Sequence, residues 1–292
     1  MENGDMKKTV TKTDIKGLKV HSFLPKVLED NDFAAGTALI LEARSLHELK
    51  KFMLDNEDFK DSPQNASMKT REWSGTFTWE EYIDLLDNGD KEVMKKLKII
   101  TNKTTGDLHK KYKDVISSYQ YDVTGEFFDI GLVLSGVPEV WLQPVIEQEE
   151  KQRIDIIING SFDSAQKKDT ITENIGYLLG LLKVLEECGV ETSVKMIAGV
   201  QNYWERSRTN KSIILITTVK QYDEPINFKK VSALISPTYL RRGMFKIEEV
   251  TAKMNLAGGY GKPMKFKGTI EIHHKRDIEA LEKRIFKEEN RK

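Results

Sequence analysis

The chain has 292 residues, of which 39% are hydrophobic and 32% are charged, so it can form one large or two ordinary domains with a substantial core. Its 46 lysine and arginine residues equal its 46 aspartate and glutamate residues, which excludes a uniformly basic surface but allows a local basic patch. The single cysteine, Cys188, excludes an intramolecular disulfide and a cysteine-based zinc site.

The N-terminal part of the chain is polar and is predicted to pack only loosely. Residues 1–18 are expected to form a disordered arm, without the apolar core of a signal peptide. No window approaches the roughly 18 apolar residues of a membrane-spanning helix, so the protein is expected to stay in the compartment where it is made. The apolar run at 33–41 is interpreted as a buried strand or the start of a helix.

Capping patterns predict the next helices. Ser45 and Thr78 each stand three residues before a glutamate, which is typical of a capping box at a helix start. Gly89 is placed to end the second helix. The helices expected in this region span 46–54, 79–88 and 91–97.

A change of pattern marks the expected domain boundary. Residues 119–144 are rich in glycine and aromatic residues, which indicates short strands and tight turns. The charged connector at 147–151 follows. We therefore expect an α+β N-terminal region at 19–150 and an α/β domain at 151–292.

The second half alternates β-rich runs with helical stripes. The elements predicted are strands at 153–159, within 190–200, at 212–219 and at 267–274, and helices at 170–188, 228–235, 239–249 and 276–289. A strand–helix–strand unit gives parallel neighbours, whereas the short link after the second strand permits an antiparallel edge pair. The sequence thus predicts an α/β fold, with a mixed, mostly parallel sheet and helices on both faces.

A polar loop follows the first of these strands, where such sheets bind ligands. Residues 159–164 supply oxygen donors from Asn159, Ser161, Asp163 and Ser164. These side chains could hold a hard cation such as Mg²⁺. The alternative is ordinary turn chemistry, for which Asn, Ser, Asp and Gly are the usual residues.

The order of elements and this loop resemble the von Willebrand factor A fold, which places Asp-x-Ser-x-Ser here to hold a metal ion that binds a partner's carboxylate. The matching positions are Asn159, Ser161 and Asp163, and only Ser161 matches outright. Asp223 is the stand-in for a metal ligand from a later loop. The resemblance implies a protein partner, and AAA+ ATPases of the MoxR type work with such domains.

The chain also resembles an uncharacterised family of tailed-bacteriophage proteins, which implies a phage setting, in the host cytoplasm or in the virion. Four segments carry this resemblance: Trp73 to Glu81, Tyr121 to Gly125, Ile156 to Gly189, and Ser236 to Phe245.

Basic residues suggest a different partner. Arg241 and Arg242 follow a proline turn and are interpreted as carboxylate partners or as phosphate contacts. Lysines and aromatics interleave at 103–112 and 262–267, a pattern that suits single-stranded nucleic acid. The pair His273 and His274 is expected on a strand, where neighbouring side chains point to opposite faces and do not chelate one metal.

Three functions follow as expectations. The first is a non-enzymatic interaction module, with an AAA+ ATPase as the partner. The second is a nucleic-acid-associated protein of phage replication or packaging, and the third is a minor virion component. An enzyme is the least supported class, because the sequence has no visible nucleophile–base pair, metal cluster or phosphate loop.

Overall fold

The computed structural model describes residues 19–20, 38–55, 59, 75–76, 78–113, 116, 152–162, 166–202, 211–252 and 262–288. The predicted arm at 1–18, the turns at 119–144 and the connector at 147–151 lie outside these ranges.

The described strands form one seven-stranded sheet in the order β1-β2-β5-β4-β3-β7, with β6 beside β4. β3 runs parallel to β4 and β7, and β2 runs parallel to β5. β4 and β5 are antiparallel. The predicted α/β fold with a mixed sheet is confirmed. The strands are β1 (Lys19–Val20), β2 (Ala38–Ala43), β3 (Arg153–Asn159), β4 (Glu191–Asn202), β5 (Lys211–Lys220), β6 (Lys262–Pro263) and β7 (Ile270–Glu271).

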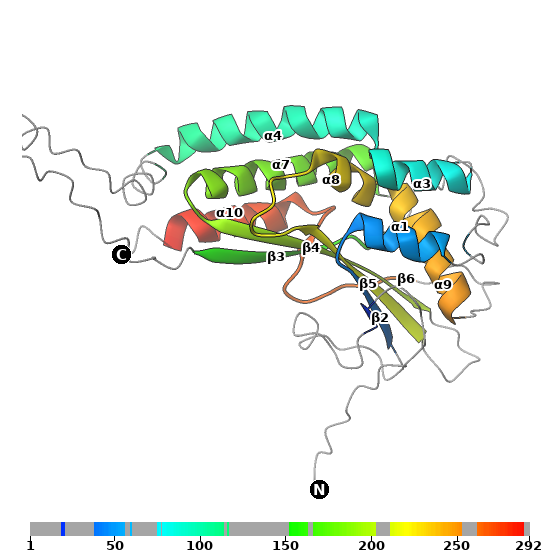
Figure 1. Ribbon diagram of the computed structural model, residues 1–292. Helices are drawn as coiled ribbons and strands as arrows, with labels where there is room; N and C mark the ends of the chain where they lie inside the picture. The colour runs from blue at the N-terminus through cyan, green and yellow to red at the C-terminus, as the bar shows by residue number, and fades with distance from the viewer. Residues whose placement is uncertain are drawn as a thin grey trace, which may run out of the picture.

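Helices in the described ranges pack above this sheet (Figure 1). They are α1 (Leu46–Leu54), α3 (Trp79–Asn88), α4 (Lys91–Lys111), α7 (Lys168–Glu187), α8 (Phe228–Leu234), the π-helix η4 (Tyr239–Met244), α9 (Phe245–Ala252) and α10 (Lys275–Glu288). The predicted caps are present, because the side chains of Ser45 and Thr78 accept hydrogen bonds from the backbone N–H groups of Glu48 and Glu81.

The antiparallel pair β4–β5 lies inside the sheet and not at its edge as predicted. The reason is β2, which comes from the N-terminal region and pairs along β5, from Ala38 opposite Ser212 to Ala43 opposite Thr217. The predicted boundary between 150 and 151 therefore does not separate two cores. One sheet and one main apolar cluster take residues from both sides of it.

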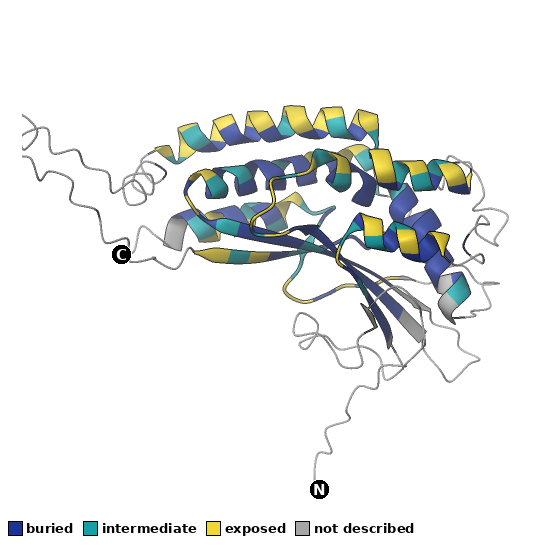
Figure 2. Ribbon diagram, in the orientation of Figure 1, coloured by how far each residue is buried: buried dark blue, intermediate teal, exposed yellow. Residues whose placement is uncertain are grey.

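Strand alternation gives the sheet two apolar faces. Leu215 of β5 belongs to the main cluster, which the helices share with the sheet, whereas Ile214 and Ile216 belong to a smaller cluster on the other face. Met264 and Phe266 cover that smaller cluster. In the described part of the chain the helices thus cover one face, where both were expected (Figures 1 and 2).

Helix α4 is much longer than the predicted 91–97 and lies on the outer side of α7 (Figure 1). Its second half contains three threonines, Asn102, Gly106 and Asp107, residue types of low helix propensity, which give a weak helical signal. Tertiary packing compensates for this, because small residues of α7 allow a close approach. A Cβ on Gly176 would lie 2.7 Å from Ile100 Cγ2, and a Cβ on Gly180 would lie 2.6 Å from Thr104 Cβ.

The strand predicted at 267–274 is reduced to β7. Gly268 has a φ of +74°, a conformation that suits a turn before the strand. After the strand, His274 N donates to Glu271 O at 2.9 Å, which closes a second turn and leads into α10. His273 and His274 therefore lie in a turn and not on a strand, and their ring centroids are 4.1 Å apart. The prediction that they point to opposite faces was wrong.

Candidate functional site

Asn159 and Ser161, the two described oxygen-donor residues of the predicted cation loop, are both engaged within the protein. The Asn159 amide donates to Met264 O at 2.9 Å and to the Glu271 carboxylate at 3.0 Å. Its Oδ1 accepts from Ser161 N at 2.9 Å, and Ser161 Oγ accepts from Gly199 N at 2.7 Å. Both side chains are buried. This arrangement favours the turn alternative, and Asp163 lies outside the described residues.

Asp223 does not join these residues. It follows β5, whose last residue, Lys220, pairs with Val194 near the start of β4. Asn159 lies at the other end of the sheet, because β3 is parallel to β4 and antiparallel in direction to β5. The prediction that Asn159, Ser161 and Asp223 share one cation site was therefore wrong. In the ranges that the structure describes, no group of three or more His, Cys, Asp or Glu side chains could hold a metal ion.

Arg241 and Arg242 are inside the protein, which is a second correction to the predicted phosphate contacts. They belong to η4 and are 8% and 0% exposed. Arg242 Nη2 donates to Thr76 O at 2.7 Å. Burial lowers the pKa of Arg242, and the nearby carboxylate of Glu81 partly opposes this. Buried guanidinium groups in these positions tie chain segments together and do not face a solvent-borne phosphate.

Two segments that carried the phage resemblance meet at this point. Besides the bond from Arg242 to Thr76, a Cβ on Gly75 would lie 2.2 Å from Thr238 Oγ1. Just after the first segment, the Tyr82 hydroxyl would lie 2.0 Å from a Cβ on Gly243. The described residues of the tryptophan-containing segment and of the Ser236–Phe245 segment thus form one packed unit.

The Glu271 carboxyl group forms a small polar cluster at the carboxyl ends of β3 and β7. Burial raises its pKa, and the hydrogen bond from Asn159 partly counteracts this effect. His273 Nδ1 lies 3.9 Å from Glu271 Oε2. The backbone N–H of Glu271 donates to Asp277 at 3.3 Å. The cluster holds the turn after β7 against the loop after β3.

The outer face of α4 carries more exposed lysines than exposed acidic residues. Glu92 and Asp107 are the exposed acidic residues of this helix, and Glu92 pairs with Lys96 at 3.1 Å. Figure 2 shows the exposed stripe along α4. Five exposed lysines on it make no ion pair with any residue in the described ranges: Lys91, Lys95, Lys98, Lys103 and Lys110.

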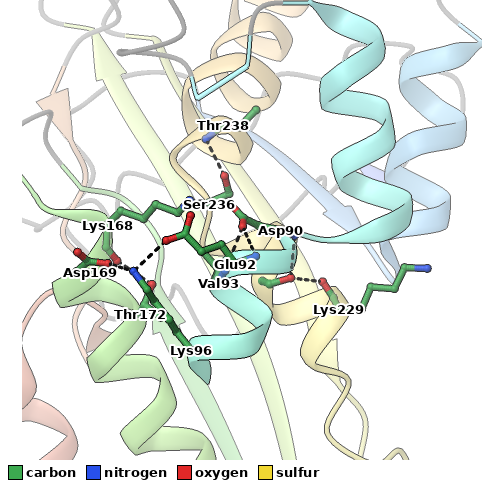
Figure 3. Close-up of polar contacts among 11 residues, drawn as sticks. Asp90, Glu92, Val93, Lys96, Lys168, Asp169, Thr172, Lys229, Ser236 and Thr238 are labelled. Carbon is green, nitrogen blue, oxygen red and sulfur yellow. Dashed lines mark hydrogen bonds and ion pairs between the residues drawn. The ribbon is translucent and has the colours of Figure 1, made fainter. Parts of the chain in front are cut away.

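The N-terminus of α4 is fixed to two neighbouring helices (Figure 3). Asp90 caps α4 by accepting from the N–H groups of Glu92 and Val93, each at 3.1 Å. Its carboxylate also accepts from Lys168 of α7 at 2.7 Å. Its backbone N–H donates to Ser232 Oγ of α8 at 3.1 Å. Burial alone would raise the pKa of Asp90, but the bonds from Lys168 and the two backbone N–H groups outweigh it and lower the pKa.

The C-terminus of α4 is fixed in a similar way. The buried carboxylate of Glu282, on α10, accepts from Lys111 Nζ at 2.6 Å and from the Tyr112 hydroxyl at 2.7 Å. It also accepts from the hydroxyl of Tyr177 on α7. His109 contacts Glu187 at 2.6 Å. The lysines thus stand on a helix of about 30 Å that is anchored at both ends.

A groove opens beside this helix, with a volume of about 550 Å³. Met94 and Lys98 of α4 line one side of it. The other side is the segment 224–230, which leads into α8. Lys98 Nζ lies 6.0 Å from the ring centroid of Phe228, so the groove combines an aromatic ring with positive charge.

Sequence reasoning finds part of this site. The lysine-rich stretch from Lys103 has a pattern that predicts nucleic-acid contacts, and its lysines, such as Lys103 and Lys110, lie on the exposed face of α4. The predicted interleaving with aromatic residues is not present on that face, because Tyr112 is half-buried and donates to Glu282. The groove escapes such reasoning, because its two sides are far apart in the sequence and no local pattern connects Lys98 with Phe228.

The comparisons with known proteins identify a family but indicate no activity. No curated protein and no solved structure matches the chain. The family model described as "Domain of unknown function (DUF7192)" matches residues 27–288, and the chain belongs to this family.

Proposed function

We propose that this protein binds nucleic acid through the lysine face of α4. The observation that carries the proposal is the set of five exposed lysines, without an ion pair among the described residues, on an outer helix of a chain whose net charge is zero. A local excess of positive charge concentrates a polyanion at that face, and each phosphate contact releases counterions. Because α4 is held at both ends, the lysines form a fixed array.

A metal-bridged interaction module is less well supported by the geometry. It needs Asn159, Ser161 and Asp223 around one ion, and these residues lie at opposite ends of the sheet. The AAA+ ATPase and virion proteins remain predicted partners that rest on the resemblances alone. A role in phage replication or packaging, in the host cytoplasm or the virion, accords with nucleic-acid binding. No described helix is both long and apolar enough to cross a membrane.

The test is fluorescence anisotropy with a labelled 20-nucleotide DNA or RNA at several salt concentrations. The variant carries Lys91→Gln, Lys95→Gln and Lys103→Gln together, which keeps good helix formers on the exposed face. The control variant changes three exposed cations elsewhere: Lys51→Gln on α1, Lys265→Gln beyond β6 and Lys283→Gln on α10.

We expect wild type and control to bind with the same affinity, and binding to weaken steeply with salt. The α4 variant should bind at least ten-fold more weakly at low salt. For a single strand, its plot of log affinity against log salt should be shallower by about 2, since each lost phosphate contact removes ~0.7 from the slope. Equal affinities for the α4 variant and the control would refute the proposal, as would no binding by wild type at low salt.

A further inference from the structure

We infer that the groove between α4 and the segment 224–230 holds one unstacked nucleobase against Phe228, so that the protein selects single-stranded over duplex nucleic acid. This inference rests on the proposed function of α4 and names its substrate class.

The chemistry of the groove suits a flat ring with polar edges. Its apolar lining comes from Met94, Pro225, Ile226 and Phe228. Phe228 is half-buried and packs on the main core, so its ring is held while part of it remains accessible. Every base has a π-face that stacks on such a ring without regard to sequence. The volume of about 550 Å³ lies within the ~300–1,000 Å³ that is usual for small-ligand sites.

Charged groups surround this apolar lining. Lys98 stands on the α4 side, and Lys229 is exposed and unpaired among the described residues. Either lysine can contact the phosphates that flank an inserted base. Lys230 lies 3.8 Å from Glu224, and this pair offers a donor and an acceptor to the base edge. Burial lowers the pKa of Lys230, although Glu224 partly opposes this.

A free phosphate is a poorer match than a base. The lysine ammonium groups can pair with a phosphate, but the backbone adds little, because the Lys230 N–H already donates to Asn227 Oδ1 at 3.1 Å. The apolar lining would also be left without a partner. A duplex keeps its bases stacked and paired, so it could contact the lysines of α4 but could not fill the groove.

The groove has fixed walls, which makes a shape-dependent site feasible. Ser232 Oγ, on α8, accepts from Asp90 N and donates to Lys229 O at 2.9 Å. Gly89 allows this approach, since a Cβ there would lie 2.6 Å from Lys229 O. The two sides of the groove are therefore joined where the start of α4 meets α8.

The experiment compares a 20-nucleotide single strand with a duplex of the same length for four variants. Phe228→Leu keeps apolar bulk but removes the ring, and Phe228→Tyr keeps the ring. Lys98→Gln removes the cation beside it. Ile99→Ser is the matched control, because Ile99 is 60% exposed on the same helix but does not line the groove. Melting curves ensure that each variant is folded at the assay temperature.

We expect wild type to prefer the single strand. Phe228→Leu should lose about ten-fold in affinity for it, which corresponds to ~1.4 kcal/mol, and should keep its affinity for the duplex. Phe228→Tyr should bind like wild type, Lys98→Gln should weaken single-strand binding, and Ile99→Ser should have no effect. Unchanged single-strand affinity in Phe228→Leu, or equal losses for both nucleic acids, would overturn the inference. If the α4 triple variant still loses affinity in that case, the proposed function stands and only the groove assignment fails.

Discussion

Asp90 and Lys168 join the N-termini of α4 and α7, the two longest of the described helices, through a hydrogen bond of 2.7 Å between carboxylate and ammonium groups (Figure 3). The same carboxylate caps α4. One side chain therefore starts the outer helix and fixes where it lies on the inner one.

Substitutions of Asp90 should separate these two roles. Asp90→Ala loses the cap and the ion pair and should lower the free energy of unfolding by about 1–2 kcal/mol. Asp90→Asn retains a capping oxygen and should lose less, measured by urea denaturation. The pKa of Asp90 is lower in the folded state than in the unfolded state. Its contribution to the free energy of unfolding is therefore present above its usual pKa of 3.8, and is lost as the pH falls through the folded-state pKa. Wild type should thus lose more stability than Asp90→Asn on acidification, and parallel pH profiles would contradict this account.

The contact between α4 and α7 should not tolerate a side chain at Gly180. Gly180→Val would bring a Cβ to 2.6 Å from Thr104 Cβ and 3.1 Å from Thr101 O, so the helices must move apart. We expect a loss of about 1–3 kcal/mol in chemical denaturation. Gly106→Ala is the control on the facing helix, because nothing lies within 4 Å of the position that its methyl group would take. That change should stabilise by about 0.5–1 kcal/mol, and similar effects of both changes would show that helix propensity alone matters.

Arg242 should act on stability and not on binding. Its side chain is fully buried, so Arg242→Ala leaves Thr76 O without this donor and opens a cavity. We expect a loss of about 3 kcal/mol or more, seen as a clear fall in melting temperature. Lys95→Gln is the opposite case and should weaken nucleic-acid binding with no change in melting temperature. If folded Arg242→Ala bound nucleic acid much more weakly than wild type, the arginine would have a role in binding.

The contribution of Glu271 to stability should change with pH in the opposite direction to that of Asp90. Its pKa is raised in the folded state. Its contribution to the free energy of unfolding is therefore greatest below its usual pKa of 4.5, and falls as the pH rises through the folded-state pKa. Glu271→Gln removes the partly buried charge and retains an oxygen that can accept from Asn159. Its melting temperature should exceed that of wild type at neutral pH, and the difference should disappear below pH 4.5. A lower melting temperature at neutral pH would show that the carboxylate itself is required.

Local signals predict the fold better than they predict the site. Ser45 and Thr78 are recognisable as caps because a cap and its partner are three residues apart. The position of Asp223 does not follow from the sequence, because strand direction depends on the whole sheet and not on the loop that follows β5. The burial of Arg241 and Arg242 cannot be predicted from the local sequence for a similar reason, since the helix that carries them is covered by segments distant in sequence.

The position of β2 between β1 and β5 also sets an order for folding. Ala38 pairs with Ser212, so the long chain between these residues must close into a loop. This closure costs conformational entropy before the strand pairing contributes any free energy. During synthesis, β2 emerges long before its parallel partner exists, whereas β3, α7 and β4 can assemble soon after they appear. Until β2 docks, the edge of β5 that it covers is open to other strands, so a chain shortened from its N-terminus should aggregate through this edge.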